Sequence, residues 1–243
     1  MKRVFLKTVA VALAALAVGN AFAADITGAG TRKAAAELAA KGFAVAMVNY
    51  RGTHESEGTW VGYRALAWGE KKDGYDICEW LAAQPWSTGK VGSFGSSQGG
   101  FAQNFLAVTQ PPHLVAQYMV DTGLSLYQEG YRIGGVTRPS RFKVIVDSKG
   151  SADNEALLRE WDQHTSYDDY WRAEDCSLHF GEMNVPCFTI GSWYDFMCQG
   201  SVASFRLARA PSLISWRISA PTTRKKMVIS PSFTRKCRER DTL

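Results

Sequence analysis

The serine at position 97 lies in a pattern that can carry nucleophilic chemistry. Residues 95–99 read GSSQG and match G-x-S-x-G, in which the serine sits on a sharp turn between a strand and a helix. Gly95 and Gly99 suit such a turn because it leaves room only for very small neighbouring side chains. Ser97 is therefore a candidate nucleophile, and a glycine-rich structural turn is the alternative interpretation.

A serine hydroxyl becomes a good nucleophile only when a base removes its proton and a carboxylate orients that base. Asp195 is the candidate acid, because it follows the predicted strand 185–191 within the sequence GSWYDFM. The backbone N–H of Gln98, at the predicted start of a helix, can stabilise an oxyanion with help from the positive end of the helix. A surface aspartate in a turn remains the alternative for Asp195.

The catalytic base is the component that the sequence does not supply. In α/β-hydrolases the chain order is serine, then acid, then histidine. All four histidines of this chain precede Asp195: they are His54, His113, His164 and His179. His54 and His179 are the two that could approach the site, although lone histidines are usually surface or structural residues. The identity of a catalytic histidine is therefore unknown from the sequence.

The elements that must position these residues alternate between strands and helices. Apolar strands are predicted at 43–50, 90–95, 114–120, 185–191 and 226–230, and helices at 32–41, 73–86 and 98–108. This alternation is typical of an α/β protein with a parallel sheet covered by helices on both faces. Ligands of such sheets bind at the carboxyl ends of the strands, which is where Ser97 and Asp195 both fall.

Residues 124–182 interrupt the alternation with aromatic and acidic stretches such as YDDYWRAED. We interpret them as a mostly helical cap inserted between two parts of the core, residues 24–123 and 183–243. A chain of 243 residues can form one domain with such an insertion. The cap is expected to act as a lid over the carboxyl edge of the sheet.

Residues 1–23 have the composition of a secretory signal peptide. Three basic residues (Lys2, Arg3 and Lys7) precede the apolar run 9–18, and AFA follows at 21–23, which is the usual order of such a leader. The alternative, a membrane-spanning helix, needs about 20 apolar residues, and a Gly-Asn pair interrupts this run. We expect export to the periplasm or secretion, with no membrane span once the leader is removed.

The formal charge of +5 is concentrated at the two ends of the chain. The leader carries +3 and residues 224–243 carry +5, which leaves −3 for residues 24–223. A body of this charge does not predict a groove for a polyanion, so no nucleic-acid partner is expected.

The five cysteines show no Cys-x-x-Cys pattern, so a zinc site is not expected, and neither is another metal or a cofactor. They are Cys78, Cys176, Cys187, Cys198 and Cys237. In an exported protein they could form two disulfides with one cysteine left over. Buried free thiols are an equally good interpretation.

Four stretches together resemble the cocaine esterase and X-prolyl dipeptidyl-peptidase family of α/β-hydrolases, which includes the α-amino acid ester hydrolases. The stretches lie at 48–60, 73–100, 167–175 and 185–195, within a match that runs from about 42 to 205. The resemblance implies an α/β-hydrolase fold with Ser97 as nucleophile, Asp195 as acid and residues 124–182 as the helical cap. It also implies small-molecule ester or amide substrates with small acyl groups, cleaved through an acyl-serine intermediate.

Three features depart from this family. Where its members carry a G-P-W-x-H segment with the catalytic histidine, this chain has MVISPSFTRK, with Thr234 near the expected position. Strands before Phe43, and a loop whose tyrosine completes the oxyanion hole, are not recognised, and no carboxy-terminal jelly-roll domain follows the core. We therefore predict a serine hydrolase by family that lacks its catalytic histidine and is either inactive or left with residual activity. The alternative is a non-catalytic remnant or small-molecule-binding protein with the same fold.

Overall fold

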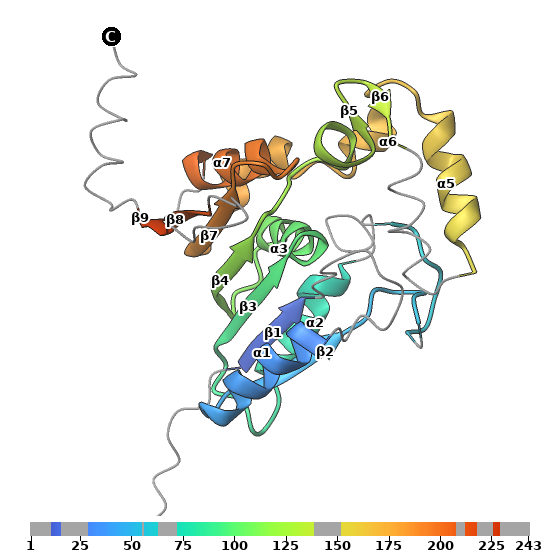
Figure 1. Ribbon diagram of the computed structural model, residues 1–243. Coiled ribbons are helices and arrows are strands. Elements are labelled where there is room, and N and C mark those ends of the chain that lie inside the picture. Colours follow the sequence, from blue (N-terminus) through green and yellow to red (C-terminus); the bar gives the residue numbers. More distant parts are fainter. Residues whose placement is uncertain are drawn as a thin grey trace, which may run out of the picture.

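The computed structural model describes residues 11–15, 29–54, 56–62, 72–138, 152–207, 212–217 and 226–228. The main sheet of the described residues has the strand order β2-β1-β3-β4-β7-β8-β9, and every pair of neighbours except β8 and β9 is parallel. These strands are β1 (Val11–Ala15), β2 (Ala44–Val48), β3 (Val91–Ser96), β4 (Leu114–Val120), β7 (Cys187–Ser192), β8 (Ser212–Arg217) and β9 (Lys226–Val228). The α/β class predicted from the sequence is confirmed (Figure 1).

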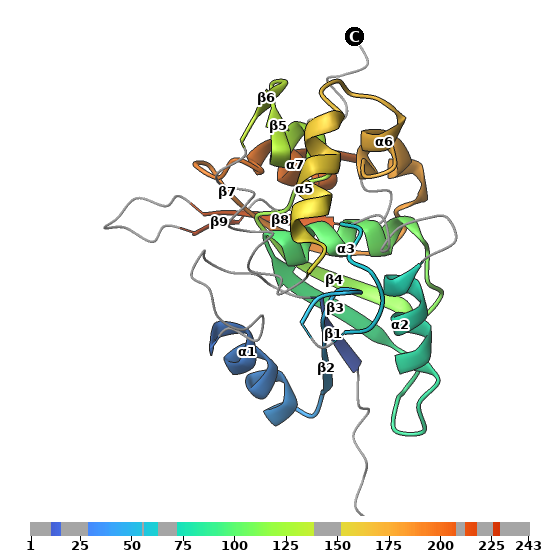
Figure 2. The ribbon, with the colours of Figure 1, turned by 90° about the vertical axis from the view of Figure 1, so that its right-hand side faces the viewer.

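Helices cover both faces of this sheet. Figure 2 shows α1 on the opposite face from α2 and α3. The four core helices are α1 (Ala29–Ala40), α2 (Asp73–Ala82), α3 (Gln98–Val108) and α7 (Cys198–Leu207). Every residue of α3 is buried, as expected for a helix that is largely apolar all around its axis. α3 is thus the central helix, packed between the sheet and the elements above it.

Two strands of the main sheet lie where none was predicted. β1 comes from the segment interpreted as a leader, and it pairs in parallel with β2 on one side and β3 on the other. The expectation that no core strand precedes Phe43 is therefore wrong for the folded chain. β8 lies in a stretch for which no element was predicted, and it pairs in parallel with β7. Periodicity missed β1 because alanine-rich apolar runs suit a leader, a helix or a buried strand equally.

The segment between β4 and β7 forms a cap at one end of the sheet (Figures 1 and 2). It contains short helices and a two-stranded hairpin: η1 (Leu126–Tyr131), β5 (Arg132–Ile133), β6 (Val136–Thr137), α5 (Asn154–Gln163), α6 (Asp169–Arg172) and η2 (Cys176–Glu182). Buried aromatic side chains of the cap, Tyr131, Trp161 and Trp171, share one hydrophobic cluster with Phe101 and Phe105 of α3. We call this the cap cluster, and it joins the cap to the core.

The described cysteines are free thiols. Cys78, Cys176, Cys187 and Cys198 form no disulfide, so the interpretation with two disulfides is wrong and the one with free thiols holds for these four. Burial raises the pKa of Cys78 to about 12, which makes this thiol a poor nucleophile at neutral pH. Cys237 lies outside the described residues. Within the described part of the chain, no helix has the length and hydropathy needed to cross a membrane.

Candidate active site

Ser97 occupies a strained turn between β3 and α3. Its backbone angles are φ 54° and ψ −118°, a conformation that non-glycine residues rarely adopt and that concentrates at functional sites. The backbone N–H of Ser97 donates to the carbonyl of Val120, at 2.9 Å, and its carbonyl accepts from Phe101, also at 2.9 Å. The turn is therefore fixed on both sides, and it presents Ser97 at the carboxyl edge of the sheet.

Gly100 is a further glycine that this turn requires. A Cβ atom at Gly100 would lie 2.8 Å from the Cβ of Thr122, closer than two carbon atoms can approach. The sequence analysis assigned the steric role to Gly95 and Gly99 alone. The sequence did indicate Gly100, because two glycines follow Gln98 and only the first of them belongs to the G-x-S-x-G pattern. This contact brings the first turn of α3 against the segment that follows β4.

Gln98 is the first residue of α3, so its backbone N–H is among those that have no acceptor within the helix. Its carbonyl accepts a hydrogen bond from the hydroxyl of Tyr50, at 3.2 Å. Burial raises the pKa of that tyrosine, so it remains a neutral donor. The side-chain Oε1 of Gln98 is buried without a hydrogen-bond partner. The sequence analysis missed Tyr50, although it follows β2 at the same edge of the sheet.

A network of buried polar side chains from β3, α3 and β4 supports this turn. The hydroxyl of Ser93 donates to Oε1 of Gln103, at 2.7 Å, and Nε2 of Gln117 donates to the carbonyl of Gln103, at 2.8 Å. Nε2 of Gln103 in turn lies 3.2 Å from the carbonyl of Gly99. These groups join β3, α3 and β4 with satisfied hydrogen bonds, which makes the base of the candidate site rigid.

Asp195 lies in the turn between β7 and α7. Its backbone N–H donates to the carbonyl of Ser192, at 3.0 Å, and its Oδ1 accepts from the backbone N–H of Met197, at 2.7 Å. The side chain is partly exposed, so its other oxygen remains available at the carboxyl edge. The structure thus places Asp195 at the edge of the sheet that carries Ser97, two strands away along β3, β4 and β7.

A second carboxylate, Asp121, lies between these two residues, and the sequence analysis missed it. It follows β4 directly, has a φ of 49° and donates its backbone N–H to the carbonyl of Ile190, at 2.7 Å. Burial and then the charges of Asp195 and Asp121 raise the pKa of Cys198, so both carboxylates lie near that thiol. The rule that functional residues follow parallel strands would have selected Asp121.

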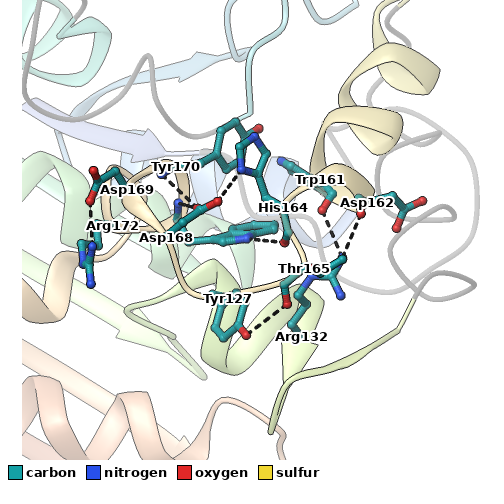
Figure 3. A network of polar contacts seen from close by, with 11 residues as sticks. Tyr127, Arg132, Trp161, Asp162, His164, Thr165, Asp168, Asp169, Tyr170 and Arg172 are labelled. Carbon is teal, nitrogen blue, oxygen red and sulfur yellow. Dashed lines mark hydrogen bonds and ion pairs between the residues drawn. The ribbon is translucent and has the colours of Figure 1, made fainter.

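None of the histidines is hydrogen-bonded to the nucleophile. Among the described residues, which include all four histidines, no side chain is hydrogen-bonded to the Ser97 hydroxyl. Three of the histidines are paired with carboxylates through Nδ1. Nδ1 of His113 lies 2.6 Å from a carboxylate oxygen of Glu79, and Nδ1 of His164 lies 2.6 Å from one of Asp168 (Figure 3). Nδ1 of His179 lies 2.9 Å from a carboxylate oxygen of Glu182. His54, with a φ of 52°, lies four residues after Tyr50 in the loop that reaches Gln98. In the described part of the chain, therefore, no histidine and no acid is hydrogen-bonded to the Ser97 hydroxyl.

No group of metal-ligating side chains was found in the described part of the chain. A groove of about 400 Å³ lies between α1 and the strands β3 and β4, where Leu38, Phe94 and Tyr118 are among its lining residues. It lies on one face of the sheet and contains none of the candidate catalytic residues. The site at Ser97 is therefore separate from this groove.

Known proteins provide an independent comparison. The family model for X-Pro dipeptidyl-peptidase (S15 family) matches residues 20–155 and 146–232. A Mycobacterium bovis protein named as a serine esterase is 36% identical over 75 residues, which are 30% of this chain and 11% of that protein. The chain thus spans only a small part of the curated relative that it matches.

Solved structures share the fold at low identity. A CocE/NonD family hydrolase from Staphylococcus aureus superposes with a TM-score of 0.68 at 23% identity, over 86% of this chain and 41% of that chain. An α-amino acid ester hydrolase superposes with a TM-score of 0.62 at 20% identity, over 84% of this chain and 41% of that one. These structures show an α/β-hydrolase fold, and the family match covers most of the sequence. The chain therefore belongs to the X-Pro dipeptidyl-peptidase (S15) family, in agreement with the resemblance of its motifs.

Proposed function

We propose that this chain is a serine hydrolase of small-molecule esters or amides that works through an acyl-serine intermediate. The observation that carries this proposal is the strained backbone of Ser97 at the turn between β3 and α3. Such a conformation costs about 1–3 kcal/mol and concentrates at active sites, which supports a catalytic task for this serine. The family membership of the chain supports the same assignment.

The reaction begins when Oγ of Ser97 attacks the carbonyl carbon of the substrate and its proton passes to a base. The carbonyl oxygen becomes an oxyanion, which the backbone N–H of Gln98 stabilises at the start of α3. Collapse of the tetrahedral intermediate expels the alcohol or amine with a proton and leaves acyl-Ser97. Water then attacks this ester in the same manner and releases the acid. Asp195 orients the base, and because no described side chain is hydrogen-bonded to Ser97, a base supplied from solution can fill that role.

A fluorophosphonate probe tests the nucleophile, because it forms a covalent bond with reactive serines. The wild-type chain is expected to become labelled slowly, with peptide mass spectrometry locating the probe on Ser97. Ser97→Ala is expected to abolish the labelling, whereas Ser96→Ala removes the neighbouring hydroxyl and serves as the matched control. Absence of label from a folded wild-type sample, or equal labelling of both variants, would reject the proposed nucleophile.

A second candidate function is binding without turnover, and one specific observation favours it. No described side chain is hydrogen-bonded to the Ser97 hydroxyl. The chain can therefore bind a small ester beside Ser97 while it lacks the groups needed for proton transfer. Under this reading a small ester would bind and raise the thermal midpoint of unfolding, yet neither hydrolysis nor labelling would be detected. Retention of the ester's effect in Ser97→Ala, together with an unlabelled wild-type chain, would favour this function over the first.

We also propose that the chain is exported with removal of residues 1–23. The basic residues and the apolar run of this segment support export, and the family match begins only at residue 20. Removal would take β1 out of the sheet, so Val11–Ala15 cannot act as leader and as strand in one mature molecule. Expression of the whole chain in a bacterial host is expected to yield periplasmic protein whose intact mass corresponds to residues 24–243. Recovery of only the uncleaved chain from the cytoplasm would contradict export.

A further inference from the structure

Glu129 of η1 has a buried carboxylate that the reaction described above does not use. The residue is 7% exposed. Its Oε2 accepts hydrogen bonds from the backbone N–H groups of Leu124, at 2.5 Å, and Ser125, at 3.3 Å. A carboxylate held in this way, far from solvent, imposes a fixed arrangement on the segment that follows β4, because moving it would leave buried N–H groups without acceptors.

The other side of the carboxylate faces the first turn of α7. A Cβ atom at Gly200 would lie 2.2 Å from Oε1 of Glu129, so only glycine allows this approach. A Cβ atom at Gly123 would lie 3.0 Å from Oε2 and 3.1 Å from the sulfur of Met197. Oε1 makes no hydrogen bond of good geometry, but it lies at the helix end where backbone N–H groups point outward. The carboxylate of Glu129 therefore lies where three segments meet: the residues after β4, η1 itself and the start of α7.

The first turn of α7 is also what holds Asp195. Oδ1 of Asp195 accepts from Met197, at 2.7 Å, and the backbone carbonyl of Asp195 accepts from Cys198, at 3.1 Å. One turn further, the hydroxyl of Ser201 accepts from the N–H of Thr122 and donates to its carbonyl, at 3.1 and 3.0 Å. Asp195 therefore moves only if the start of α7 moves, and that start is fixed by Thr122 on one side and Glu129 on the other.

We propose that Glu129 is a positioning residue for Asp195, which it acts upon by holding the first turn of α7 against the cap. This inference rests on the proposed function, in which Asp195 orients the base. Glu129 does not touch the substrate in this account. It links the cap, where it resides, to the loop that carries the acid.

The contact between Glu129 and the first turn of α7 is expected to weaken as the pH rises. Burial raises the pKa of Glu129 to about 7, an effect that the N–H groups of Leu124, Ser125 and Gly200 partly offset and the charge of Asp175 reinforces. Among the described residues, Asp175 and the thiol of Cys176 are titratable groups that interact with Glu129. Because the folded pKa lies above the ordinary value, the closed arrangement binds the proton more tightly. The stabilisation is therefore complete at acidic pH and is lost as the pH rises to about 7.

Amide hydrogen exchange measured by mass spectrometry tests the link without any activity. In the wild-type chain, protection of the peptide that contains residues 197–201, corrected for intrinsic exchange, is expected to fall as the pH rises through about 7. Glu129→Gln keeps the shape but cannot ionise, so its protection is expected to stay constant over this range. Glu155→Gln, which alters an exposed carboxylate on α5, is the matched control and should behave as wild type. A pH-independent wild-type protection, or the same pH response in Glu129→Gln, would overturn the proposal.

The functional readout is the rate of fluorophosphonate labelling of Ser97 with imidazole present as base. Glu129→Ala is expected to lower this rate about threefold to tenfold, less than the roughly hundredfold loss that a 1 Å misplacement of a catalytic group can cause, because Glu129 acts on Asp195 only through α7. Glu129→Gln is expected to restore the rate. The ratio of the wild-type rate to the Glu129→Gln rate should fall as the pH rises. A constant ratio combined with a fully active Glu129→Ala would reject the positioning role. If the wild-type chain is never labelled, the proposed function fails, whereas the exchange measurement still decides the role of Glu129.

Discussion

Imidazole added to the buffer is expected to accelerate hydrolysis of a simple alkyl ester by the wild-type chain about tenfold or more. A positioned base contributes about 10²–10⁴ to such reactions, and this chain has a strained serine to which no histidine is hydrogen-bonded. A free imidazole can enter beside Ser97, which is partly exposed, and can take the proton for which no described side chain forms a hydrogen-bonded acceptor. It recovers only part of the missing factor because a base in solution lacks the effective molarity of a fixed one.

Ser97→Ala is the essential control for this experiment, since imidazole itself hydrolyses activated esters and an alkyl ester keeps that background low. The acceleration should disappear in Ser97→Ala and be reduced in Asp195→Asn, which can no longer hold the imidazolium ion. His54→Ala and His179→Ala should behave as the wild type does, with His113→Ala as a control at the opposite end of β4. Fast hydrolysis without imidazole that is lost in His54→Ala or His179→Ala would show that the chain has its own base.

The core of the fold could be predicted because its elements carry strong local signals. The helix predicted at 98–108 and the strand predicted at 114–120 have those bounds in the structure, and the turn between β3 and α3 was indicated by glycine spacing. β1 could not be predicted, because its alanine-rich sequence takes its conformation from β2 and β3 on either side of it. β8 could not be predicted for the same reason, since its conformation depends on its long-range pairing with β7 and not on a local sequence pattern.

The candidate site could be predicted only where one residue in a local pattern carries the chemistry. Ser97 and Asp195 were found because each follows a predicted strand, and the structure places both at the carboxyl edge. Their roles remain predictions. Asp121 also follows a predicted strand and was overlooked, whereas Glu129 was not found because its importance comes from its contact with α7, far along the sequence. A buried carboxylate in a cap has no sequence signature, since the same residue type is usually exposed.

Replacing Trp171 with alanine is expected to lower the free energy of unfolding by about 3–5 kcal/mol, the usual cost of removing a large buried aromatic side chain. Trp171 is fully buried in the cap cluster. Its ring centroid lies between 5.3 and 6.3 Å from those of four neighbours, Tyr127, Tyr131, Trp161 and Tyr170. Its indole N–H also donates to the carbonyl of His164, at 2.7 Å. The substitution therefore leaves both a cavity and a carbonyl without its donor.

Urea denaturation separates these two contributions. Trp171→Phe keeps an aromatic ring and loses the hydrogen bond, so its cost should be the smaller one of about 1–3 kcal/mol. Trp86→Ala removes a tryptophan that is 49% exposed, and it should change the stability by only about 0.5 kcal/mol. Because the cap cluster includes Phe101 and Phe105 of α3, the cap and the core should unfold in one transition in all three variants. A Trp171→Ala protein with an unchanged midpoint, or with a separate early transition of the cap, would show that the cap does not depend on this cluster for its attachment to the core.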